Sequence, residues 1–67
     1  MEISIEALVD ANTMPWDRAA VLASILRHPE LTTAEASREA MLEFESNDDA
    51  DSADRARACL AIYKSVR

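Results

Sequence analysis

This chain of 67 residues contains no glycine. Glycine most easily adopts the backbone conformations that two-residue hairpin turns and phosphate-binding loops need. Its absence disfavours β-hairpins and excludes every glycine-rich nucleotide loop. With only two prolines to interrupt the chain, helices with polar caps are the elements that we expect.

Cysteine and aromatic residues are scarce as well. The single cysteine, Cys59, can form neither an intramolecular disulfide nor a cysteine-rich zinc site. We expect it to be a small core residue in a protein from a reducing compartment. One tryptophan, one tyrosine and one phenylalanine cannot fill a core, so aliphatic and alanine side chains must build it through close contacts between helices.

Long apolar runs and excess positive charge are also missing. No run approaches the roughly 20 residues that a membrane span requires, and the first residues carry acids where a signal peptide would be basic. Thirteen acidic residues against seven basic ones give a net charge of -6. Such a charge repels phosphates and anionic membranes, so it disfavours nonspecific binding of nucleic acid and binding to membranes. Without a membrane span or a signal peptide, we expect a cytoplasmic protein.

What the chain does contain is helical periodicity with local start and stop signals. The pattern predicts one helical domain over residues 1–67, with helices at residues 4–11, 14–28, 32–45 and 48–66. Ser4 is a cap, Pro15 fits a first turn, Pro29 ends the second helix, and Thr32 with Glu35 has the form of a capping box. The predicted fold class is all-α, a compact bundle of about four short helices whose central pair resembles a helix-turn-helix.

The second predicted helix is unusually apolar. One stripe is made of Trp16, Ala19, Ala20, Ala23 and Leu26, and it is widened by Val21, Leu22 and Ile25. A helix of this kind contacts several neighbours or a second protomer. A homodimer would use this helix, through Trp16, Val21, Leu22 and Ile25, or the fourth one, through Tyr63 and Val66. Trp16 is either an interface hot spot or a buried anchor beside Pro15.

Charge is strongly segregated near the carboxyl end. Six acids and no base lie between Glu43 and Asp54, whereas the residues from Arg55 onward carry four bases and no acid. Carboxylates stabilise a helix start, and Asp51–Arg55 and Asp54–Arg57 have the spacing of helical ion pairs. The alternative interpretation is an acidic patch directed at a basic partner.

Catalytic and metal-binding signatures are absent from the sequence. His28, the only histidine, precedes Pro29 at a helix end, where an imidazole has a structural role. Residues 45–56 resemble a calcium loop, but Ala50 and Ala56 occupy its glycine and glutamate positions. We therefore expect no enzyme activity, no metal and no cofactor.

The third helix is poorly suited to recognise DNA. It would offer Glu35, Arg38 and Glu39 to a groove lined by phosphates, which is one base against two acids.

These observations favour a protein-binding module. We expect it to inhibit or regulate a larger partner by occupying a basic surface of the kind that binds nucleic acid. In size and charge alone the chain resembles phage-encoded inhibitors and immunity proteins. The alternatives are a helix-turn-helix-like transcriptional regulator and a structural adaptor subunit. The candidate partner-binding residues are Glu43, Glu45, Asp48, Asp49, Asp51, Asp54 and Trp16.

Overall fold

Four helices make up the part of the chain that the computed structural model describes, which is residues 4–67. They are α1 (Ile5–Asn12), α2 (Pro15–Leu26), α3 (Thr33–Glu45) and α4 (Ala50–Val66). No strand occurs among these residues. The predicted all-α bundle is therefore confirmed, and each helix boundary lies within two residues of its predicted position.

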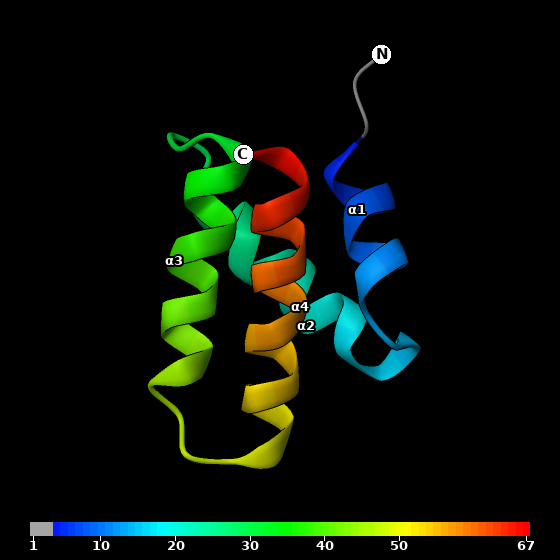
Figure 1. Cartoon of the computed structure of the whole chain (residues 1–67), viewed down its shortest axis with the longest axis vertical. Coiled ribbons are helices and arrows are strands. Elements are labelled where there is room, and N and C mark those ends of the chain that lie inside the picture. The colour runs from blue at the N-terminus through cyan, green and yellow to red at the C-terminus, as the bar shows by residue number, and fades with distance from the viewer. Residues whose placement is uncertain (1–3) are drawn as a thin grey trace.

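The longest helices, α3 and α4, form an antiparallel hairpin and make the most extensive contact in the molecule. In Figure 1 α2 passes behind this hairpin, and α1 lies beside α4 on the far side from α3. The helices α2 and α3 follow one another through residues 27–32. Their likeness to a DNA-binding helix-turn-helix stays a prediction.

The helix starts follow the local signals in the sequence. The Ser4 hydroxyl accepts a hydrogen bond from the Ala7 backbone N–H at 3.1 Å, and Pro15 occupies the first turn of α2. At α3 the Thr32 hydroxyl accepts from the Glu35 N–H at 3.2 Å and donates to the Glu35 carboxylate at 3.0 Å. Each cap satisfies backbone donors that the helix itself leaves without partners.

Small side chains dominate the contact between α3 and α4. Ala36 and Ala40 on α3 and Ala56 and Cys59 on α4 are all buried, and small residues let two helix axes approach closely. Larger side chains close the core around them: Leu8, Val9, Val21, Ile25, Phe44 and Ile62. The prediction that Cys59 is a core residue is confirmed, because it is completely buried.

The structure divides the apolar residues of α2 between a buried face and an exposed face. Trp16, Ala19, Ala23 and Leu26 are exposed, and Ala20 is half-buried. The buried residues are instead Asp17, Val21, Ser24 and Ile25. Val21 and Ile25, which were predicted to take part in a homodimer contact, therefore belong to the core of the single chain and cannot contact a second copy.

The partner of the buried acid is Arg55 of α4. Its Nε donates to Asp17 Oδ1 at 2.9 Å, and the Asp17 side chain is only 9% exposed. The hydrogen bond to Asp17 raises the pKa of the Arg55 guanidinium above its usual value. This ion pair fastens the first turn of α2 to α4. It replaces the predicted Asp51–Arg55 pair.

Candidate protein-binding surface

The acids of residues 43–54 lie at one end of the α3–α4 hairpin. This segment comprises the last turn of α3, the connection to α4 and the first turns of α4. In Figure 1 it forms the yellow-green and yellow end of the hairpin. An acid can bind a partner most easily if its carboxylate makes no hydrogen bond or ion pair inside the molecule.

Glu43 is engaged internally. Its carboxylate accepts from Arg27 Nη1 at 2.9 Å and lies 3.1 Å from His28 Nε2. Both partners directly follow α2, so Glu43 fastens the α2–α3 connection to α3. The side chain of Glu43 is 37% exposed, which leaves it less available than its acidic neighbours. The bond from His28 is compatible with its predicted structural role at a helix end.

Asp49 and Asp54 are engaged as well. Asp49 caps α4, because its carboxylate accepts from the Ser52 backbone N–H at 2.7 Å and from the Ser52 hydroxyl at 3.1 Å. These hydrogen bonds, the backbone one first, hold the pKa of Asp49 below its usual value. Asp54 pairs with Arg57, as the helical spacing predicted. Both side chains remain solvent-exposed.

Three acids of this segment form no such bond, although the charge of Asp51 in the first turn of α4 contributes to raising the pKa of Arg55. Within residues 4–67, the carboxylates of Glu45, Asp48 and Asp51 make no hydrogen bond or ion pair, and all three residues are exposed. We call these three residues the acidic end. Their charges are the ones that a partner could neutralise without first breaking a contact inside the molecule.

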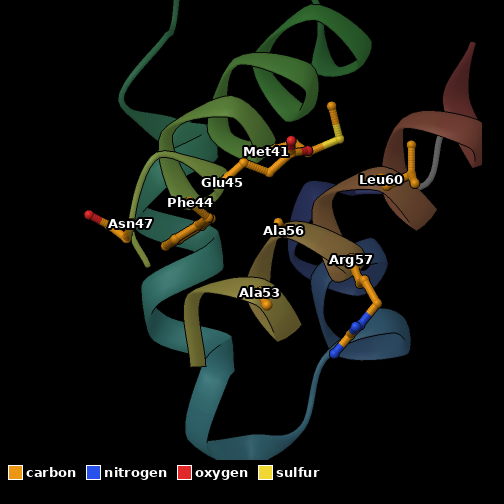
Figure 2. A pocket seen from close by; sticks show the side chains of 8 residues that line it. All are labelled: Met41, Phe44, Glu45, Asn47, Ala53, Ala56, Arg57 and Leu60. Carbon is orange, nitrogen blue, oxygen red and sulfur yellow. The ribbon is translucent and has the colours of Figure 1, made fainter. Parts of the chain in front are cut away.

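An apolar groove adjoins the acidic end. It has a volume of about 330 Å³ and lies between α3 and α4. Figure 2 shows Met41 and Phe44 of α3 on one side and Ala53, Ala56 and Leu60 of α4 on the other. The remaining lining residues are polar, namely Glu45, Asn47 and Arg57. Glu45 therefore belongs both to the acidic end and to the rim of the groove.

Trp16 lies outside this region and is 71% exposed. The expectation of a buried anchor beside Pro15 was wrong, because the neighbouring Asp17 takes the inward position. An exposed tryptophan is uncommon on a surface that contacts only water, since its large apolar ring favours burial. The idea that Trp16 contacts a partner stays a prediction.

Other chemistry in the described chain is limited. Burial, together with the nearby charge of Glu43, raises the pKa of the Cys59 thiol to about 12, which makes it a poor nucleophile. No group of three or more His, Cys, Asp and Glu among residues 4–67 is arranged to hold a metal ion. None of the four helices is long and apolar enough to cross a bilayer.

Comparisons with protein-family models, with curated proteins and with solved structures found no match to this chain. The functional argument therefore depends on the charges and the shape of the surface described above.

Proposed function

We propose that this protein binds a larger protein through the acidic end, and that it inhibits or regulates that partner by occupying a basic surface. The binding involves no chemical reaction. Basic surfaces of this kind commonly bind nucleic acid, because clustered lysine and arginine side chains neutralise phosphates. The small protein would then compete with the nucleic acid for the same surface.

The proposal depends on one observation, which is that only some of the acids of residues 43–54 have partners inside the molecule. Glu43, Asp49 and Asp54 have partners inside the molecule, whereas Glu45, Asp48 and Asp51 have none among the described residues. Those three lie within seven residues of one another, in a chain that already carries a net charge of -6. Like charges held this close repel one another, and a cationic surface would relieve the repulsion.

The groove supports the proposal independently. Charge alone steers association and selects partners more than it provides affinity. An apolar groove beside the charges supplies the missing component, because burial of apolar surface contributes roughly 25 cal/mol per Å². A partner that places a basic side chain near Glu45 and an apolar side chain between Phe44 and Ala56 would use both features.

Affinity capture from a lysate of the native cell tests the proposal. The bait variant replaces the acidic end with neutral isosteres, Glu45→Gln, Asp48→Asn and Asp51→Asn. Asp49 must be left intact, since its loss would remove the cap of α4 and confuse unfolding with lost recognition. The matched control is Glu6→Gln, Glu30→Gln and Glu39→Gln, three exposed acids elsewhere on the molecule, which changes the net charge equally.

We expect a partner that wild type and control both retain and that the acidic-end variant loses. Heparin should release this partner, since a polyanion competes for the same basic surface. Equal loss from both variants would mean that only net charge matters, and retention by both would mean that the acidic end is not the interface. Binding of the small protein itself to heparin would instead favour the DNA-binding alternative.

A further inference from the structure

The outward face of α2 is apolar along its whole length. At about 3.6 residues per turn, Trp16, Ala19, Ala23 and Leu26 fall on one side of the helix, and all four are exposed. We call these residues the outer stripe. Trp16 is 71% exposed and Leu26 is 54% exposed. The buried residues of α2 lie on the opposite side, so the outer stripe faces away from the core.

The outer stripe is symmetric about its own centre. Its members are spaced by three, four and three residues, which is the spacing of a two-helix seam. The midpoint is Val21, so Trp16 and Leu26 are equidistant from it, as are Ala19 and Ala23. If a second copy of α2 lies antiparallel across this midpoint, Trp16 meets the second copy's Leu26 and Ala19 meets its Ala23. Small side chains at the centre let the helices approach, and large ones close the ends.

Such self-complementarity fits a second copy of this chain as the molecule that covers the outer stripe. A two-fold interface must place the same patch on both subunits, with each residue i facing j while j faces i. A surface that matches itself in reverse has the property that a second copy requires. We propose that two copies of this chain associate through the outer stripe, with their α2 helices antiparallel about Val21.

Charge points to the same face. Two copies with a net charge of -6 each repel one another, so a contact face without acids is favoured. The outer stripe contains no charged residue. The two charges within α2 are both engaged, Asp17 with Arg55 on the inner face and Arg18 with Asp10 at the side. The exposed faces of the other helices carry acids, for example Glu6 on α1, Glu39 on α3 and Asp54 on α4.

The size of the stripe sets the strength of the dimer. A helix of 12 residues is about 18 Å long, so its face is small. The buried area falls at the low end for protein interfaces, below about 1,200 Å² in total. We therefore expect a reversible dimer.

Sedimentation velocity over a range of protein concentrations tests the proposal. Wild type should shift from monomer to dimer as concentration rises. Ala23→Glu places a carboxylate on the stripe, where dimerisation would bury it without a partner, and should weaken the dimer about 100-fold or more. Because Ala23 is exposed in the single chain and glutamate favours helices, the fold should persist, which circular dichroism will verify. The control is Ala7→Glu, an equal change of charge at an exposed position of α1.

Disulfide trapping tests the orientation. In the antiparallel arrangement a cysteine at position 19 lies level with one at position 23 of the second copy. Mixed Ala19→Cys and Ala23→Cys chains should therefore cross-link faster than either chain with itself. The buried Cys59 does not interfere. A wild type that stays monomeric, a dimer unaffected by Ala23→Glu, or faster cross-linking of Ala19→Cys with itself would each overturn the proposal.

Discussion

The acidic end and the outer stripe are both exposed, but the first presents negative charge and the second presents apolar surface. Glu45, Asp48 and Asp51 present three carboxylates with no partner among the described residues, whereas the outer stripe presents Trp16 and Leu26 without any charge. The interior described by residues 4–67 leaves no buried side-chain donor or acceptor without a hydrogen bond. The two surfaces are therefore suited to different partners, a cationic one and an apolar one.

The largest effect that we expect contrasts a buried aromatic residue with an exposed one. Phe44 is 8% exposed and Trp16 is 71% exposed. Phe44→Ala should lower the free energy of unfolding by about 3 kcal/mol or more, because it leaves a cavity between α3 and α4. Trp16→Ala should change the monomer's stability by less than about 0.5 kcal/mol. Urea unfolding followed by circular dichroism at low protein concentration measures both, and a similar loss for Trp16→Ala would place its ring in the core.

The next effect concerns the ion pair that joins the start of α2 to α4. Arg55→Met leaves the Asp17 carboxylate buried without its partner, and such a carboxylate costs about 3 kcal/mol. The double variant Asp17→Leu, Arg55→Met removes both charges and should recover much of the loss. Thermal or urea unfolding of both variants and of wild type gives the comparison. If the double variant were less stable than Arg55→Met, the pair itself would be the source of stability.

Cys59 should be protected by its burial. With its pKa at about 12, the thiol should react with a disulfide reagent at pH 8 at least about 100-fold more slowly in the folded chain than in urea. Between the ordinary pKa of 9.0 and about 12, the unfolded chain loses the proton and the folded chain keeps it. Stability should therefore fall as pH rises through that window. A Cys59→Ala variant should lack this part of the alkaline slope, and fast labelling of folded wild type would contradict the account.

The smallest effect concerns the cap of α4. Because the folded pKa of Asp49 lies below its usual value of 3.8, its contribution to stability is present above that pH and is lost as pH falls through the folded pKa. Asp49→Asn keeps a capping oxygen without a titrating group. Wild type should be slightly more stable than Asp49→Asn at pH 6, and the difference should shrink as the pH falls below 3.8. Asp48→Asn removes the same charge outside the cap and should not reproduce this pH dependence.

Local features of the fold could be predicted from the sequence, whereas features that join distant segments could not. The caps at Ser4 and Thr32 and the pair Asp54–Arg57 depend on residues a few positions apart, and each is present. The pair Asp17–Arg55 joins residues 38 positions apart, and no spacing rule predicts it. The burial of Asp17 depends on this pair, so the buried face of α2 could not be read from its apolar pattern alone.

Contacts between distant segments also limit what could be predicted of the acidic end. The sequence identified the whole acidic run, but it could not separate acids with internal partners from those without. Glu43 meets Arg27 and His28 only because α2 and α3 pack together. The groove between Phe44 and Ala56 likewise depends on how α3 and α4 are aligned, which no local pattern fixes.

The most direct test of the central claim is the association rate constant of the captured partner with wild type and with the two triple variants. Charges at an interface act mainly on this rate. We predict a fall of at least about tenfold for Glu45→Gln, Asp48→Asn, Asp51→Asn and less than about threefold for the matched control. Equal rates for the two triple variants would contradict the claim that the acidic end recognises a basic partner.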